Sequence, residues 1–251
     1  MISAVRTFSS GLAAVGLVVG LSSSAHATLQ LAVDINGVAF SCVDNNAACD
    51  TNPAVGTIQL ANELFAGVQV NGSITTSVGT PANPAALDVL NASSLSIINT
   101  NGVSVDFNTA ISDTDFKGPV SSFTASGSGT FQLADGSSVT LGFFDDPTNT
   151  QGANTSTDAP GTEVFSFSHT AVGSADSFSQ NETGPASDTG PFSMTLTTSG
   201  TLIAGGELIT NGRTIIKTPT TSVSEPAPLM LLGAALLGLG WCIRRRRQFD
   251  F

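Results

Sequence analysis

Acidic side chains are the groups in this sequence whose types and spacing best suit chemistry. Three groups set oxygen ligands close together in predicted loops: Asp44 with Asp50, Asp113 with Asp115, and Asp145 with Asp146 and Asn149. Ca²⁺ takes roughly six to eight such oxygens, but none of the groups has the spacing of an EF-hand loop. The sequence therefore favours solvated surface charge. It leaves calcium binding open, with Asp145, Asp146 and Asn149 as the metal candidates, and no other cofactor is expected.

Catalysis would need such carboxylates to meet in space. Two Asp or Glu side chains can hydrolyse a glycosidic bond, so a secreted hydrolase that acts on polysaccharide through loop carboxylates stays an alternative. A Ser-His-Asp site is not indicated, because no Gly-x-Ser-x-Gly elbow occurs in the chain. His169 continues the alternation of Phe165 and Phe167, and we interpret it as one side chain on a sheet face. We assign no catalytic residue and expect a protein that is not an enzyme.

The first 27 residues have the pattern of a secretory signal peptide. Arg6 supplies a positive start, residues 11–21 are apolar, and Ala25-His26-Ala27 is a small-x-small cleavage site. The apolar part is too short for a membrane anchor. We therefore expect export, with the exported chain beginning near Thr28.

Cys42 and Cys49 are the cysteines of the exported part, and export places them where disulfides form. The sequence predicts that they pair and that the closed ring pins the loop between them. A metal site or a reactive thiol is the sharper alternative. It is disfavoured because no histidine or third cysteine lies nearby.

The exported part, residues 28–224, is strongly acidic. It carries three basic residues against 17 acidic ones, a formal charge of −14. Binding to nucleic acid needs Lys and Arg side chains that displace counterions, so this class of function is excluded. The chain has no tyrosine, and its one tryptophan, Trp241, lies in the tail. The usual aromatic platform of a sugar-binding site is therefore missing, and only Phe side chains are available as a weaker substitute.

Composition and alternation predict an all-β fold, an antiparallel β-sandwich or jelly roll. Ser, Thr, Val, Gly and Phe dominate residues 28–213, and the residues that fill exposed helix faces are scarce. Short runs of period-2 alternation are bounded by turn signals such as Asn36-Gly37, Asn101-Gly102 and Asn211-Gly212. Asn71-Gly72 is compatible with either a turn or a bulge within one strand. We expect one domain over residues 28–213 and an extended tether over residues 214–224.

The clearest predicted hairpin lies around Asp135-Gly136. Phe131 and Leu133 alternate before this dipeptide, and Val139, Leu141 and Phe143 alternate after it. Residues 145–161 and 174–190 are polar and contain glycine and proline. Both stretches are predicted to be long loops.

The tail, residues 225–251, combines an acidic-proline element, an apolar run and an arginine cluster. The run over residues 229–243 has no charge, and as a helix it would be about 22 Å long, short of the roughly 30 Å of hydrocarbon. Arginines at its end stay cytoplasmic, and their long stems extend the span. The tail is thus predicted to be a weak C-terminal transmembrane anchor, with the bulk of the chain outside.

These tail residues resemble the PEP-CTERM protein-sorting signal of Gram-negative bacteria that make exopolysaccharide. The resemblance covers about the last 25 residues, and Ser224 stands where the signal has its first proline. It implies recognition by an integral-membrane exosortase, a cysteine transpeptidase-like enzyme that processes the tail and releases or transfers the protein to the cell surface. The residues that carry the resemblance are Ser224, Glu225, Pro226, Arg244, Arg245, Arg246 and Arg247.

Taken together, the sequence predicts an exported cell-surface or extracellular-matrix protein. It would pass through an intermediate anchored in the inner membrane, with an exosortase as its partner during processing. Its function would be that of a structural or binding module associated with exopolysaccharide. An adhesin that binds a partner through a sheet edge is not separated from this prediction by the sequence.

Overall fold

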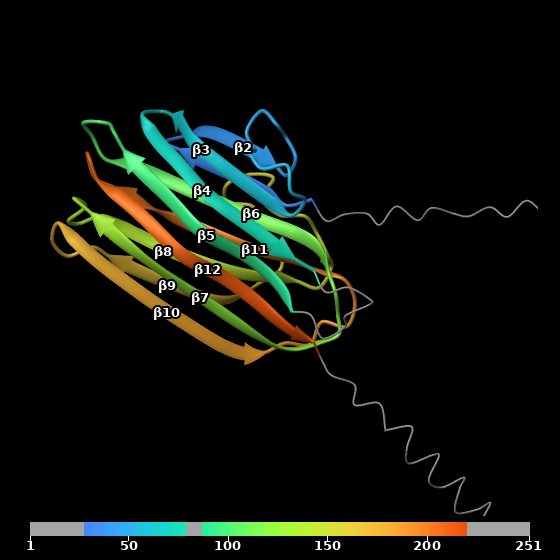
Figure 1. Cartoon of the computed structure of the whole chain (residues 1–251). Coiled ribbons are helices and arrows are strands. Elements are labelled where there is room, and N and C mark those ends of the chain that lie inside the picture. Colours follow the sequence, from blue (N-terminus) through green and yellow to red (C-terminus); the bar gives the residue numbers. More distant parts are fainter. Residues whose placement is uncertain (1–27, 79–86, 220–251) are drawn as a thin grey trace, which may run out of the picture.

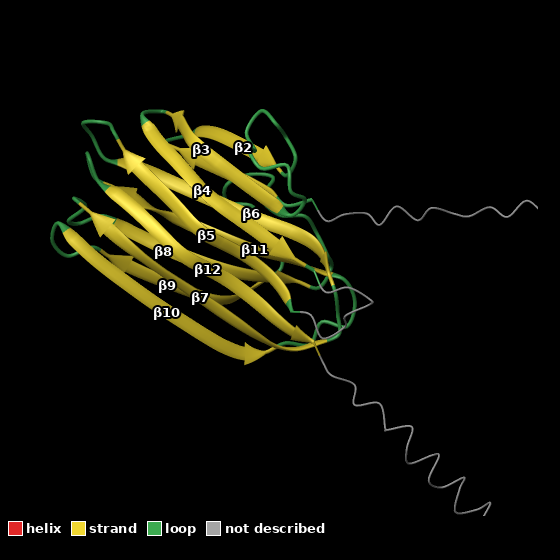
Figure 2. Ribbon diagram, in the orientation of Figure 1, coloured by secondary structure: helices red, strands yellow, loops and turns green. Residues whose placement is uncertain are grey.

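The computed structural model describes residues 28–78 and 87–219. The predicted signal peptide, the apolar run over residues 229–243 and the sorting residues lie outside these ranges. The described residues form strands throughout, joined by turns and loops (Figures 1 and 2). The strands are β1 (Gln30–Ile35), β2 (Val38–Val43), β3 (Thr57–Phe65), β4 (Val68–Ser77), β5 (Asp88–Asn99), β6 (Val105–Phe116), β7 (Val120–Gln132), β8 (Ser138–Asp146), β9 (Thr162–Thr170), β10 (Ala175–Pro185), β11 (Phe192–Leu202) and β12 (Glu207–Pro219).

Two six-stranded sheets face each other. Sheet A has the order β2-β1-β6-β11-β8-β9, and sheet B has the order β10-β7-β12-β5-β4-β3. Neighbouring strands are antiparallel in both sheets. Figure 1 shows sheet B in front of sheet A. The predicted all-β, antiparallel sandwich is confirmed.

Alternation along the strands builds the core between the sheets. In β1, Leu31, Val33 and Ile35 are buried on the inner face, while the side chains between them turn to the outer face. Phe107 of sheet A and Phe131 of sheet B are among the largest fully buried side chains. The outer faces carry mainly Ser, Thr and Asn, so polar surface is left available on both sides of the sandwich.

The Asn-Gly dipeptides play different roles. Asn36 and Gly37 join β1 to β2 with positive φ values of 50° and 83°, and the Gly37 amide donates to Asp34 Oδ1 at 2.9 Å. This turn is confirmed. Asn71-Gly72 instead lies inside β4, where Gly72 opposes Leu95. A Cβ at Gly72 would lie 2.5 Å from the Ser94 carbonyl oxygen, so the glycine serves close strand approach rather than a turn.

The hairpin predicted around Asp135-Gly136 is wrong. The chain does turn there, with Gly136 at φ 83°, but β7 belongs to sheet B and β8 to sheet A. The connection therefore crosses between the sheets. Both strands point an apolar face into the same core, and alternation of this kind is the same for a hairpin and for a crossing. The pattern alone could not distinguish them.

Of the two long loops predicted from the sequence, one is wrong and the other is nearly right. The loop predicted over residues 174–190 is largely strand β10, which pairs with β7 along its whole length. It is polar because it is an edge strand whose side chains are mostly exposed. The loop predicted over residues 145–161 is nearly right, since the segment after β8 is irregular until β9 begins.

The predicted boundary between domain and tether is also wrong. Strand β12 runs to Pro219 between β5 and β7, and Ile215 and Lys217 are buried. Its many β-branched residues suit a central strand as well as an extended linker. The domain therefore includes residues 214–219.

Strand β12 ends at Pro219, at one end of the sandwich. At this end of the sandwich β2, β6 and β8 also end, and β5 and β11 begin. Strand β1 begins there too (Figure 1). We call it the tail end, because the chain continues from it toward the sorting residues.

Candidate functional site

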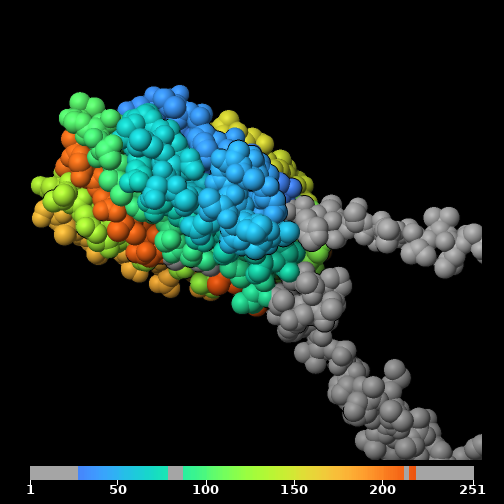
Figure 3. Space-filling model, turned by 45° about the horizontal axis from the view of Figure 1, so that its top comes forward, coloured from blue at the N-terminus to red at the C-terminus, as the bar shows by residue number. Residues whose placement is uncertain are grey.

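A long loop between β8 and β9, residues 147–161, folds over the outer face of sheet A. Ala153 is buried in a small cluster with Ala32 and Ala110, and the Gly152 amide donates to Ser112 Oγ at 3.1 Å. A Cβ at Gly152 would lie 2.7 Å from Thr195 Oγ1, so only glycine lets the loop lie this close. The yellow loop is visible beside the blue strands β1 and β2 in Figure 3, although it lies far from them in sequence.

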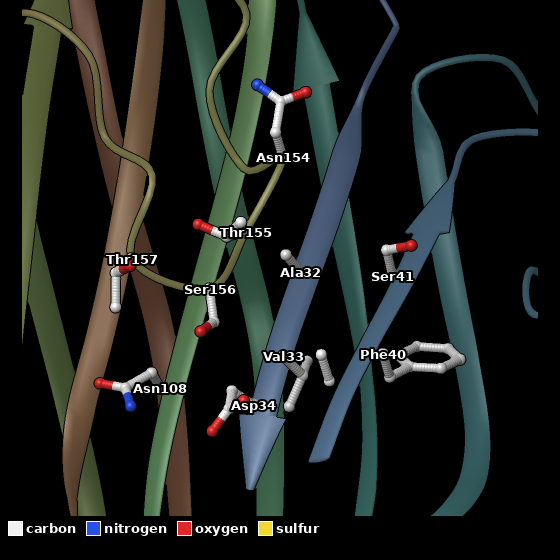
Figure 4. A pocket seen from close by; sticks show the side chains of 11 residues that line it. Ala32, Val33, Asp34, Phe40, Ser41, Asn108, Asn154, Thr155, Ser156 and Thr157 are labelled. Atoms are coloured by element: carbon white, nitrogen blue, oxygen red, sulfur yellow. The ribbon is translucent and has the colours of Figure 1, made fainter. Parts of the chain in front are cut away.

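The edge of this loop and the strands beneath it form a groove of about 500 Å³. Strands β1, β2 and β6 provide its floor, and residues 154–157 of the loop provide one wall (Figure 4). Asp34 opposes Asn108 in the sheet register, so both side chains point to the outer face. The groove exists because small residues, Ala32 and Ala39, line its floor.

Most polar side chains of the groove have no partner among the described residues. Hydrogen bonds within the described chain engage only two lining side chains: Asp34, which accepts from the Gly37 amide, and Asn154. The Asn154 side-chain amide donates to Asp158 Oδ2 at 2.7 Å and to the Gln151 carbonyl at 3.0 Å. The hydroxyls of Ser41, Thr155, Ser156 and Thr157 and the amide of Asn108 are therefore available to a ligand.

The metal candidates of the sequence lie at the tail end, and each has protein partners. Asp146 accepts from the Thr148 hydroxyl at 2.7 Å and from the Thr148 and Thr150 amides, both at 2.9 Å. These hydrogen bonds hold its pKa below the usual value although burial opposes them. Asn149 exchanges hydrogen bonds with Asp115. Asp146 is buried and the Asp145 side chain is only 12% exposed, so the expectation of solvated surface charge is wrong for both.

Asp145, Asp146 and Asn149 each contact a different partner: Lys217, the Thr148 and Thr150 amides, and Asp115. Across residues 28–78 and 87–219, no three His, Cys, Asp or Glu side chains gather closely enough to hold a metal ion. Calcium binding at these residues stays a prediction.

Cys42 and Cys49 form the predicted disulfide, with their Cα atoms 5.8 Å apart. It closes the loop after β2, which is also held by the Asp50 carboxylate. This carboxylate accepts from the backbone amides of Asn45, Asn52 and Gln59 at 2.9–3.0 Å. Asp50 is thus a structural residue of this loop.

Removing the disulfide should destabilise the domain without unfolding it. The double variant Cys42→Ala with Cys49→Ala is expected to lose about 2.5 kcal/mol of unfolding free energy, because the eight-residue ring no longer restricts the unfolded chain. Urea denaturation of the exported chain measures the loss. Reduction of the wild type should shift its midpoint similarly and leave the variant unchanged; a variant as stable as the oxidised wild type would contradict the expectation.

A buried ion-pair cluster at the tail end was missed by the sequence interpretation. Lys217 of β12 is fully buried, and its Nζ lies 2.5 Å from Asp145 Oδ2 and 3.0 Å from Asp188 Oδ2. Rings of Phe123 and Phe192 lie 5.9 and 5.5 Å from the same nitrogen. One signal could have found it: Lys217 continues the period-2 alternation of Ile215 and so points inward.

The electrostatics of this cluster are unbalanced. Burial raises the pKa of Asp145, the contact with Lys217 opposes this rise, and the neighbouring Asp188 adds to it. Asp145 Oδ1 is buried and has no hydrogen-bond partner among the described residues. Two carboxylates therefore share one ammonium group in a region with little solvent.

Asp113 is a second buried acid near the tail end. Its Oδ1 accepts from the Thr114 amide at 2.9 Å, while its Oδ2 is buried without a partner in the described chain. Burial raises the pKa of Asp113 to about 6, the nearby Thr76 hydroxyl and the Thr114 amide oppose the rise, and the charges of Asp44 and Asp115 add to it.

His169 lies on a sheet face, as interpreted. Its ring stacks on Phe131 and Phe167, with centroids 6.2 Å away in each case, and packs 5.2 Å from the Phe178 ring. Its Nε2 lies 2.9 Å from Asp176 Oδ2. Because the ring fills an aromatic cluster between β9 and sheet B, the geometry points to packing.

Comparison with solved structures finds only weak likenesses. The carbohydrate-binding module TmCBM61, solved with β-1,4-galactotriose, has a TM-score of 0.31 and 13% identity, and the match covers 60% of this chain and 88% of that one. The C-terminal CBM6 of the laminarinase LamC from Zobellia galactanivorans has a TM-score of 0.23 and 12% identity, and the match covers 64% of this chain and 98% of that one. A chain of the T13 viral particle of IBDV has a TM-score of 0.30 and 11% identity, and the match covers 80% of this chain and 52% of that one. At such scores the likenesses do not say what this chain binds.

No curated protein has significant sequence similarity to the chain. In the described part of the chain, no helix is long and apolar enough to cross a membrane.

The tail is matched directly. Residues 222–246 fit the model of the PEP-CTERM protein-sorting motif, which confirms the resemblance in the same stretch. This motif marks an exported protein that an exosortase processes at the membrane. The chain thus carries a PEP-CTERM protein-sorting motif at residues 222–246 and is, by that signal, an exported surface protein.

Proposed function

We propose that this protein is a non-enzymatic, polysaccharide-binding module of the cell surface or extracellular matrix, and that it binds a neutral glycan in the groove on sheet A. The observation that carries the proposal is the set of polar side chains that face the groove without partners: Ser41, Asn108, Thr155, Ser156 and Thr157. Sugar hydroxyls donate and accept hydrogen bonds, and so do hydroxyl and amide side chains.

Charge supports a neutral ligand. The exported part has a formal charge of −14, and the groove itself contains Asp34 and no basic side chain. An acidic polysaccharide would be repelled by this surface, while a neutral one would not. The groove has about the volume of a small-molecule site, so we expect it to take one or two sugar rings of a longer chain.

The carboxylates support binding over hydrolysis. Glycosidases place two carboxyl groups on either side of the scissile bond, whereas Asp34 is the one acid among the groove's lining residues. The loop acids of the hydrolase alternative are turned elsewhere. Asp145 contacts Lys217, and Asp146 holds the backbone of its own loop.

The sorting motif supports the location. We infer that the exported chain is first held in the inner membrane by its tail, is cut by an exosortase near Glu225, and then reaches the cell surface or matrix. A polysaccharide-binding groove would retain the released protein there. The groove opens on the outer face of sheet A, and residues 222–246 follow β12 of sheet B, so the groove and the motif do not share residues.

Binding should depend on Asn108. Affinity electrophoresis of the exported chain through gels that contain neutral polysaccharides would find a ligand, and calorimetric titration would measure its affinity. Asn108→Ala is expected to weaken binding about tenfold, the effect of roughly 1.4 kcal/mol from one lost hydrogen-bonding group. The matched control is Asn181→Ala, which removes an exposed amide from β10 on the other sheet and should leave affinity unchanged.

The proposal fails if no neutral polysaccharide retards the wild type. It also fails if Asn108→Ala and Asn181→Ala bind as the wild type does, because the ligand would then lie outside the groove.

A further inference from the structure

The Lys217 cluster joins three segments that are distant in sequence. Lys217 comes from β12 in sheet B, Asp145 from β8 in sheet A, and Asp188 from the connection between β10 and β11. The Nζ atom lies 2.5 Å from Asp145 Oδ2 and 3.0 Å from Asp188 Oδ2. The side chains of Lys217 and Asp188 are 1% and 8% exposed. An amine, a carboxyl group and a second carboxyl group are thus held together out of water.

As a simple ion pair this arrangement is costly. Removing charges from water costs several kcal/mol per ion in proteins unless hydrogen bonds compensate. Here two acids share one ammonium group, and Asp145 Oδ1 has no partner in the described chain. The rings of Phe123 and Phe192 lie at cation–π distance from the nitrogen, which offsets part of this cost without supplying a hydrogen-bond acceptor. Burial raises the pKa of Asp145. Burial and the sharing of one nitrogen by two acids thus favour the protonated form of Asp145.

We propose that Lys217 and Asp145 condense into an intramolecular amide, a covalent cross-link between β12 and β8, with Asp188 carrying protons. This goes beyond the proposed function, because neither the groove nor the sorting motif takes part. It is a modification site built from an amine, an electrophilic carboxyl group and a proton carrier, which are the parts that nucleophilic acyl chemistry requires.

The reaction balances without any co-reactant. The Lys217 ammonium passes a proton to Asp145, which leaves a neutral amine and a carboxylic acid. The amine nitrogen attacks Cγ of Asp145, and the C–N bond forms. Asp188 accepts a proton from that nitrogen and returns it to the Asp145 hydroxyl, the C–O bond breaks, and one water leaves. Asp188 ends as it began. Fixed proximity of the reacting groups supplies the main advantage over the same reaction in solution.

The cross-link would act on the strand that leads to the tail. It closes a ring from Asp145 to Lys217 and fastens the end of β12 across the core to sheet A. The last strand could then not be peeled from the domain by a pull on the chain beyond residue 219. A surface protein held through this end would gain resistance to mechanical and proteolytic opening.

Intact mass spectrometry of the purified exported chain, with its disulfide reduced, tests the proposal. Fragmentation first establishes the two termini of the purified chain. The measured mass of the wild type should then be lower, by the mass of one water, than the mass calculated from the sequence between those termini. Lys217→Arg keeps the charge but not the nucleophile, so it should show its full sequence mass. Asp188→Asn should also show full mass, because the proton carrier is gone while both reacting groups remain.

Digestion provides a readout that does not depend on how the variants fold. Trypsin cuts after a free lysine but not after one whose side chain is an amide, so the wild type should not release the peptide of residues 214–217, and fragment ions should join Lys217 to Asp145. Release of that peptide from the wild type at full sequence mass would overturn the proposal. A bond to Asp188 instead would overturn the assigned roles. Neither result bears on glycan binding, which is measured separately.

Discussion

Lys217→Ala is expected to lower the free energy of unfolding by about 3–5 kcal/mol, because it leaves the buried carboxyl groups of Asp145 and Asp188 without the nitrogen that holds them, as an ion pair or as the proposed amide. The effect should be among the largest for any single substitution outside the aromatic core. Lost packing of the lysine stem against Phe123 and Phe192 adds to it. Urea denaturation of the exported chain, monitored by far-UV circular dichroism, measures the change.

A matched control separates the buried cation from charge in general. Lys117 is exposed, so Lys117→Ala removes the same charge and should change the unfolding free energy by less than about 0.5 kcal/mol. The account of the tail end is contradicted if both variants are equally stable. It would then follow that Lys217 reaches solvent.

Asp113→Asn is expected to stabilise the protein at neutral pH. The folded-state pKa of Asp113 is raised from 3.8 to about 6, mainly by burial. The folded protein therefore holds this proton where the unfolded chain has lost it, and stability falls as pH rises through the window from 3.8 to about 6. Above that window the penalty is complete, at most about 3 kcal/mol. The side chain of the Asp113→Asn variant has the same shape but no charge, so the variant does not have this penalty.

The pH profile provides the decisive comparison. The wild type should gain stability relative to Asp113→Asn as the pH is lowered from 7 to about 4, and the two should converge near the unfolded pKa. Asp44 and Asp115, whose charges face Asp113, are present in both proteins and cancel in the difference. A constant difference between the two proteins over this range would show that Asp113 binds its proton equally well in the folded and unfolded states, and burial would then not raise its pKa.

The sequence predicts the class of fold because that depends on local signals. Alternation such as Leu31, Val33 and Ile35 fixes which face is buried, and Asn36-Gly37 fixes a turn by its need for positive φ. Sheet membership is not local. The strands on either side of Gly136 lie in opposite sheets, and their side-chain pattern would be unchanged in a hairpin.

The candidate sites were harder to predict from the sequence, because they too depend on contacts between distant segments. The groove forms where residues 154–157 lie beside Asn108. No sequence motif predicts that these two segments meet. Asp145 was singled out as a loop acid, but its partner Lys217 was assigned to the tether. The alternation of Ile215 with Lys217 was the available signal, and a Thr- and Pro-rich context concealed it. The disulfide was predictable because Cys42 and Cys49 leave few alternatives.

Binding of a neutral glycan in the groove on sheet A can be located residue by residue. The experiment is NMR of the ¹⁵N-labelled exported chain, titrated with oligosaccharides cut from the neutral polysaccharide that the electrophoresis identifies. If the glycan binds in the groove, the backbone amide signals of Asn108, Asn154 and Thr157 and the side-chain amide signals of the two asparagines should shift with ligand, while those of Asn181 should not. Shifts confined to sheet B or to the tail end, with Asn108 and Thr157 unmoved, would contradict binding in the groove.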